Sequence, residues 1–186
     1  MERTEKKRNV KKIVIWAIAV TLILFCVVSM IVVKLIFDDT FSRGEMSPYS
    51  TSLRYADVED RYSRSPREFY SGENRLQAYV YGEENDKGLV VISHGMGGGH
   101  EGYMSDICWF VDHGWRVFGF DNTGSCESEG ESIVGLVQSA LDLDAALTFI
   151  EGDTELSELD VFLYGHSWGG YGVAAVLNFD HDVTVV

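Results

Sequence analysis

Residues 160–177 read DVFLYGHSWGGYGVAAVL and carry the clearest structural signal in the chain. The first five residues form a compact apolar run that suits a buried strand. The small residues from Gly169 onward suit a helix that packs closely against a sheet. Between the two, residues 165–169 have the pattern G-x-S-x-G. A strand that turns sharply into a helix at this pattern would hold Ser167 in a strained backbone conformation above the sheet.

Such a turn needs glycine on both sides of the serine. Side chains at Gly165 and Gly169 would collide across the turn, and glycine removes those collisions. The start of the following helix directs free N–H groups and a positive dipole end towards Ser167, where they would stabilise negative charge. The pattern therefore predicts Ser167 as a nucleophile, supported by the two glycines.

Short apolar runs alternate with amphipathic stretches before this segment. Residues 76–81, 88–93 and 116–120 suit strands, and residues 103–113 and 133–151 suit helices. The second helix would place five apolar residues on one stripe: Leu136, Ala140, Leu143, Leu147 and Ile150. Parallel neighbouring strands need a crossover connection, and a helix is the usual one. This order predicts an α/β fold, with a mostly parallel sheet that is covered by helices on both faces.

A glycine-rich segment, His94-Gly95-Met96-Gly97-Gly98-Gly99-His100, directly follows the predicted strand at residues 88–93. Glycine lets the backbone turn there and direct an amide at a ligand. A loop of this kind could also bind phosphate. It lacks the spacing G-x-x-x-x-G-K-[ST], so nucleotide binding is disfavoured.

Together the two motifs resemble the α/β-hydrolase superfamily, and within it the membrane-associated serine hydrolases similar to monoacylglycerol lipases and serine aminopeptidases. The resemblance covers residues 67–186. It implies that Ser167 attacks an ester or amide carbonyl and forms an acyl-enzyme, while the backbone amides of Met96 and Trp168 form the oxyanion hole. It implies no metal or organic cofactor, since a Ser–His–acid mechanism needs none.

Other residues of the two motifs are expected to support this site. His94 and Gly95 would brace the oxyanion loop, and His166 should point away from the nucleophile as a packing or supporting residue. The loop at residues 121–130 resembles a loop of the superfamily, although Cys126 stands where glycine is more frequent.

The rest of the triad is not evident in the sequence. In the superfamily the acid and then the histidine follow the serine. Nineteen residues follow Ser167, and the cluster Asp180-His181-Asp182 would lie about 18 Å away at the end of a helix. The chain ends at residues 183–186 in what resembles the start of another strand. We therefore expect the sequence to be incomplete at its C-terminus, and the chain by itself to be inactive.

An uncharged run of 21 residues, Ile13 to Val33, lies near the N-terminus. It matches the length of about 20 apolar residues that a helix needs to cross a bilayer. A cleaved signal peptide is the alternative, because basic residues precede the run. The run is too long for one, no small-x-small cleavage site follows it, and Lys34 closes it, so an uncleaved anchor is favoured.

Charge predicts the topology of the chain. Residues 1–12 form a basic cytoplasmic tail and residues 13–36 a single-pass anchor in the cell membrane, which leaves the remainder extracytoplasmic. Residues 37–66 mix polar and charged residues without periodicity and are predicted as a stem. Residues 67–186 would then be the hydrolase domain.

Charge also limits the partners. Of the chain's 15 Lys/Arg and 29 Asp/Glu, residues 1–12 hold six and two, so the remainder has 9 against 27 and a net charge of −18. Such a body would repel the phosphates of nucleic acid. The expected partners are a lipid bilayer and a small acyl ester, lipid or peptide substrate.

The sequence leaves two points open, the pairing of the cysteines and a second hypothesis for function. Cys108 and Cys126 are the only cysteines outside the apolar run, and they give no zinc spacing or disulfide framework. The second hypothesis for function is a catalytically inactive, membrane-anchored remnant of a hydrolase that acts as a binding module.

Overall fold

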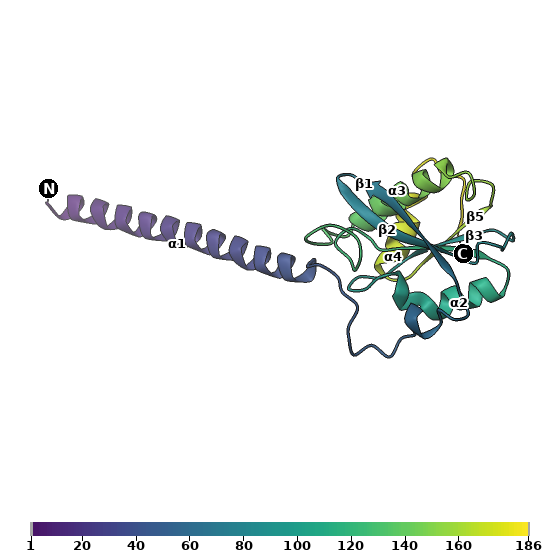
Figure 1. Cartoon of the computed structure of the whole chain (residues 1–186). Coiled ribbons are helices and arrows are strands. Elements are labelled where there is room, and N and C mark those ends of the chain that lie inside the picture. Colours follow the sequence, from purple (N-terminus) through teal and green to yellow (C-terminus); the bar gives the residue numbers. More distant parts are fainter. Residues whose placement is uncertain (1, 186) are drawn as a thin grey trace. The chain divides into compact units, whose positions relative to one another are not determined.

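A six-stranded sheet with the order β1-β2-β4-β3-β5-β6 organises the chain after Thr40 (Figure 1). The structure, a computed structural model, describes the backbone of residues 2–185 and the side chains of residues 9–184. Strands β3, β4, β5 and β6 are mutually parallel, while β2 runs antiparallel to both β1 and β4. The bounds are β1 Arg64–Ser71, β2 Asn74–Tyr81, β3 Leu89–Ser93, β4 Arg116–Phe120, β5 Val161–Gly165 and β6 Thr184–Val185.

Helices cover both faces of this sheet (Figure 1). Helix α2 (Met104–Asp112) packs on one face, and α3 (Gln138–Gly152) and α4 (Trp168–Val176) pack on the other. Strand β3 is buried throughout, with Val91 in the cluster of α3 and α4 and with Val90 in the cluster of α2. The predicted α/β fold is therefore confirmed.

The predicted helix at residues 133–151 is wrong at its start. Helix α3 begins at Gln138, because the preceding residues make other bonds. Val134 has a φ of 61°, the Gly135 amide donates to the carbonyl of Ile133 at 2.6 Å, and Ser132 forms a β-bridge with Ser42. Leu136 consequently lies outside the helix and is exposed, whereas the other four residues of the predicted stripe are buried: Ala140, Leu143, Leu147 and Ile150.

The sequence pattern also misses strand β1. This edge strand buries only Phe69 and Ser71, so its apolar periodicity is weak. It pairs with β2 through a two-residue turn, in which Gly72 adopts a φ of 60°. Ahead of it, the short 3-10 helix η1 (Tyr55–Asp57) leads to Val58, which is buried in the cluster of α2.

The chain divides into two compact units between Thr40 and Phe41. The first unit is helix α1 (Glu2–Thr40), whose part from Asn9 onward is long and apolar enough to cross a membrane, although a signal sequence passes the same test. Residues 41–66, which the sequence pattern predicts as part of a stem, belong to the same unit as the sheet. The predicted domain boundaries remain predictions.

Helix α3 offers a test of the core. Leu143 is fully buried in the cluster of α3 and α4, and Leu141 on the same helix is 45% exposed. We expect Leu143→Ala to lower the free energy of unfolding by about 2–5 kcal/mol, because it leaves a cavity. Urea unfolding measures the change, and Leu141→Ala is the matched control. A similar loss in both variants would contradict this packing.

Candidate active site

Ser167 lies at the turn between strand β5 and helix α4. Its φ of 55° and ψ of −116° are unusual for a residue with a side chain. A Cβ atom at Gly169 would overlap the carbonyl group of Ser93 at the end of β3, and a Cβ at Gly165 would lie 2.6 Å from the carbonyl oxygen of Gly169. Glycine at these two positions is therefore required for the close contact between α4 and the sheet.

An open cleft of about 320 Å³ lies beside Ser167. The cleft brings Ser167 and His166 together with Gly95 and Met96 of the glycine-rich loop. Its other lining residues are Gly97, Gly98, Gly99, Gly102, Tyr103, Met46, Ser47, Ser50 and Ser52. Ser167 and Met96, one from each motif, thus share one cleft, although they are about 70 positions apart in the sequence.

Trp168 is the first residue of α4 and is buried next to Ser167. Its indole Nε1 donates to the carbonyl of Leu136 at 2.9 Å, and its own carbonyl accepts from the Ser139 hydroxyl at 3.1 Å. These two bonds fix the backbone at the start of α4. The side chain of Met96 is 38% exposed at the cleft. The oxyanion roles of the Trp168 and Met96 amides remain predictions.

His94 is fully buried and braces the glycine-rich loop. Its Nδ1 donates to the carbonyl of Gly95 at 2.8 Å, and its Nε2 accepts from the amide of Asn122 at 2.9 Å. Burial lowers the pKa of His94, although the charge of Asp121 acts in the opposite direction. The ring is therefore held neutral, with both nitrogens occupied, and cannot act as a general base.

Tyr103 links the glycine-rich loop to the turn at Ser167. Its hydroxyl accepts from the amide of Gly95 at 2.9 Å and lies 3.0 Å from Nδ1 of His166. This hydroxyl is a supporting group that the sequence pattern did not indicate, because Tyr103 lies eight positions from one partner and 63 from the other.

None of the five histidines hydrogen-bonds Ser167 among the residues that the structure describes. His181 bonds Glu151 at 2.6 Å and Asp144 at 2.9 Å on helix α3, and His113 stacks on Trp109. The described residues therefore supply no base to the serine hydroxyl. They also contain no group of three or more His, Cys, Asp and Glu side chains placed to hold a metal ion.

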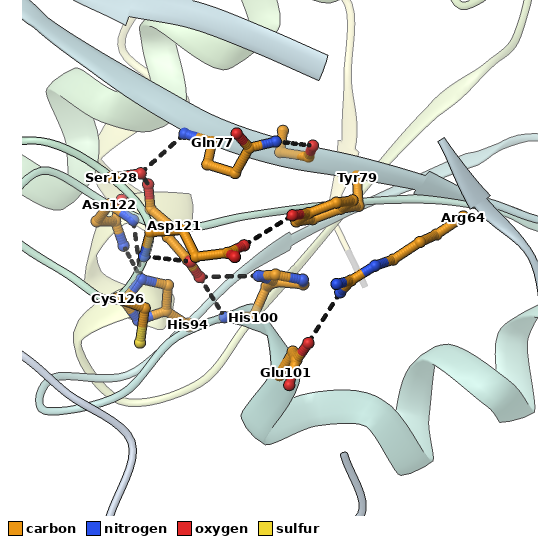
Figure 2. Close-up of polar contacts among 12 residues, drawn as sticks. Arg64, Gln77, Tyr79, His94, His100, Glu101, Asp121, Asn122, Cys126 and Ser128 are labelled. Atoms are coloured by element: carbon orange, nitrogen blue, oxygen red, sulfur yellow. Dashed lines mark hydrogen bonds and ion pairs between the residues drawn. The ribbon is translucent and has the colours of Figure 1, made fainter. Parts of the chain in front are cut away.

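A buried pair, His100 and Asp121, joins the glycine-rich loop to the loop after β4 (Figure 2). One carboxylate oxygen of Asp121 accepts from the His100 amide and from His100 Nδ1, both at 2.8 Å. The other oxygen accepts from the amide of Glu127 at 3.2 Å. Tyr79 stacks on the His100 ring, which Tyr81 contacts through its hydroxyl at 3.1 Å.

This pair determines the charge of Asp121. Burial would raise the pKa of its carboxyl, but the charge and hydrogen bonds of His100 lower the pKa to about 2. Gly97, Gly99 and Gly102 do have the spacing G-x-G-x-x-G of dinucleotide-binding loops. A Cβ at Gly99 would lie 2.5 Å from an oxygen of Asp121, and this carboxylate would repel a phosphate.

The structure also shows whether the two cysteines outside the apolar run form a disulfide. Cys108 and Cys126 are free thiols. Cys108 belongs to α2 and is buried, whereas Cys126 lies near Asp121 with a φ of 41°. This left-handed conformation explains why glycine would be favoured at position 126.

The sequence profile of the family described as "Serine aminopeptidase, S33" matches residues 84–185, more than half of the chain. The chain belongs to this family. It is accordingly a hydrolase domain of the α/β-hydrolase superfamily. A comparison with curated proteins gives no match.

Solved structures show the same fold. The Pyrococcus furiosus esterase Pf2001 has a TM-score of 0.62 at 16% identity, covering 77% of this chain and 55% of its own. The α/β hydrolase GrgF from Penicillium sp. sh18 has a TM-score of 0.58 at 25% identity, covering 65% and 43%. Epoxide hydrolase A from Mycobacterium thermoresistibile has a TM-score of 0.53 at 26% identity, covering 65% and 37%. The chain thus spans between 37% and 55% of the length of these proteins.

The His100–Asp121 pair predicts a pH dependence of stability. The pKa of Asp121 falls from its ordinary value of 3.8 to about 2 on folding. The folded state therefore binds fewer protons than the unfolded state in this range, and the stabilisation is present above about pH 4 and is lost as the pH falls towards 2. Between these limits, the free energy of unfolding of the wild type should fall by about 2 kcal/mol more than that of Asp121→Asn.

Urea unfolding at several pH values measures this difference. Asp86→Asn, at an exposed position, is the control and should follow the wild type. Parallel pH profiles for the wild type and Asp121→Asn would contradict the account of this pair.

Proposed function

We propose that the protein is a serine hydrolase that cleaves a carboxylic ester or amide through an acyl-enzyme on Ser167. The observation that carries the proposal is the strained conformation of Ser167, with a φ of 55°, between β5 and α4. Strain of this kind persists where the surrounding structure supports it, and it is concentrated at functional sites. The membership in the serine aminopeptidase family supports the same reaction class.

The mechanism follows from the chemistry of the cleft. The Ser167 hydroxyl would attack the carbonyl carbon, and its proton would pass to a general base. The amides of Met96 and Trp168 would stabilise the oxyanion, the second of them at the N-terminus of α4. The leaving group would depart with the proton, and water would then hydrolyse the acyl-enzyme.

The general base and its acid partner are not assigned among the residues that the structure describes. Within residues 9–184, His94 and His100 are occupied in buried bonds and His181 is bonded to α3. The chain spans 55% of the Pf2001 esterase and 43% of the hydrolase GrgF.

Membrane anchoring is the second part of the proposal. Between Ile13 and Val33 the side chains of α1 are mostly apolar and exposed, as expected for a segment in contact with lipid. By the positive-inside tendency, the basic residues ahead of Ile13 would keep the N-terminus in the cytoplasm, with the hydrolase unit on the far side of the membrane. The substrate would then be an extracytoplasmic ester or amide.

Removal of the nucleophile tests the reaction. In the complete protein, including any part that follows Val186, Ser167→Ala should lower the hydrolysis rate of p-nitrophenyl butyrate by about 10⁴-fold or more, because no acyl-enzyme can form. Ser157→Ala, which removes an exposed hydroxyl, is the matched control. Equal rates in the Ser167 variant and the wild type would favour the alternative, a remnant that acts as a binding module.

The mass of the mature protein tests the anchor. Protein extracted from membranes with detergent should retain residues 13–36, since an uncleaved anchor stays attached. Intact-mass measurement followed by N-terminal peptide mapping gives the result. A mature N-terminus located after the apolar run would show instead that the segment is a signal peptide.

A further inference from the structure

The residues that directly follow α1 are bonded to the loops of the site. We call residues 41–54 the arm. The Arg43 guanidinium donates to the carbonyls of Ser128 at 3.0 Å and Gly130 at 2.8 Å, and to that of Cys126. Three carbonyls of one loop thus share one cation, which fixes the start of the arm against the loop after β4.

The next residue continues this attachment. Gly44 is buried, donates to the carbonyl of Gly124 at 2.8 Å and accepts from the amide of Cys126 at 2.9 Å. A Cβ at Gly44 would lie 3.5 Å from the Cα of Gly97. The arm is therefore packed between the loop after β4 and the glycine-rich loop.

This attachment sets the position of Met46, the half-buried side chain two residues further along. Its sulfur would contact Cβ atoms built at Gly98 and Gly102, at 3.6 and 3.5 Å. Met46 lines the cleft of Ser167 and also a neighbouring cavity of about 290 Å³. The side chain therefore lies between two cavities.

The two cavities differ in chemistry. The neighbouring cavity is lined by charged and polar groups: Glu45, Arg54, His100, Glu101, Asp121, Cys126 and Glu127. An apolar chain that passed Met46 would remove water from these groups without replacing their hydrogen bonds. Methionine is flexible and apolar, so the Met46 side chain can separate the two cavities while it contacts a carbon chain in the cleft of Ser167.

We infer that the arm is part of the substrate site and that Met46 is a specificity-determining residue, which limits the site to esters or amides with a short group on this side of Ser167. The inference rests on the proposed function. It assigns a role in substrate selection to the segment that joins the apolar helix to the hydrolase unit.

Alkylation of the Ser167→Cys variant tests, without any catalysis, whether the Met46 side chain limits the length of a group bound beside residue 167. In a Ser167→Cys background of the complete protein in detergent, the rates of modification by iodoacetamide and by N-octyl iodoacetamide are measured on the peptide that contains residue 167. Met46→Ala should raise the ratio of the octyl rate to the iodoacetamide rate, and Met46→Trp should lower it, each by roughly tenfold.

Matched variants distinguish a local steric effect of the Met46 side chain from a general change in the structure of the cleft. Met46→Leu keeps the volume and should keep the ratio. Tyr49→Ala truncates an arm side chain that is 92% exposed and should also leave it unchanged. The iodoacetamide rate itself should stay the same in all variants, because this reagent is too small to contact the side chain at position 46.

The outcomes distinguish the two proposals. An unchanged ratio in both Met46→Ala and Met46→Trp would overturn the role of Met46, even if Ser167 proves to be the nucleophile. A changed ratio in a protein whose hydrolysis does not depend on Ser167 would support the role of Met46 and reject the proposed reaction.

Discussion

The contact between Gly169 and the carbonyl of Ser93 constrains the rest of the site. It joins the start of α4 to the end of β3 at a distance that admits no side chain, and this close contact confines Ser167 to a tight turn between β5 and α4. The positive φ of Ser167 follows from that geometry. The same contact places the glycine-rich loop, which begins after Ser93, on the cleft that Ser167 lines. Strand ends, rather than flexible loops alone, therefore define the cleft.

Around this turn, buried polar groups hold the loops to one another. Neutral His94 connects Gly95 to Asn122, and the Asp121 carboxylate connects His100 to Glu127. The bonds of His94 to Asn122 and of Asp121 to His100 join the glycine-rich loop to the loop after β4, so a shift of one loop would leave unpaired donors in the other. A cleft built in this way keeps its shape before substrate arrives, which favours stabilisation of a transition state by fixed amides.

The sequence predicted the fold class, the central strands and the segment around Ser167, because apolar runs such as residues 88–93 and the glycines at 165 and 169 are local signals. It misplaced the start of α3, since the pairing of Ser132 with Ser42 depends on a distant segment. Strand β1 was missed because its exposed face is polar. The roles of Arg43, Met46 and Asp121 gave no local signal, because they depend on partners that lie up to 87 positions away in the sequence. The site roles of Met96 and Trp168 remain predictions.

Covalent labelling can locate the nucleophile. The complete protein would be incubated with a fluorophosphonate, digested, and mapped by mass spectrometry. An activated serine reacts with such a reagent and an unassisted one does not. The account predicts one stoichiometric adduct on the peptide that contains Ser167, and its loss after denaturation of the protein before labelling. An adduct on another serine, or an unmodified Ser167 in a protein that hydrolyses esters, would contradict it.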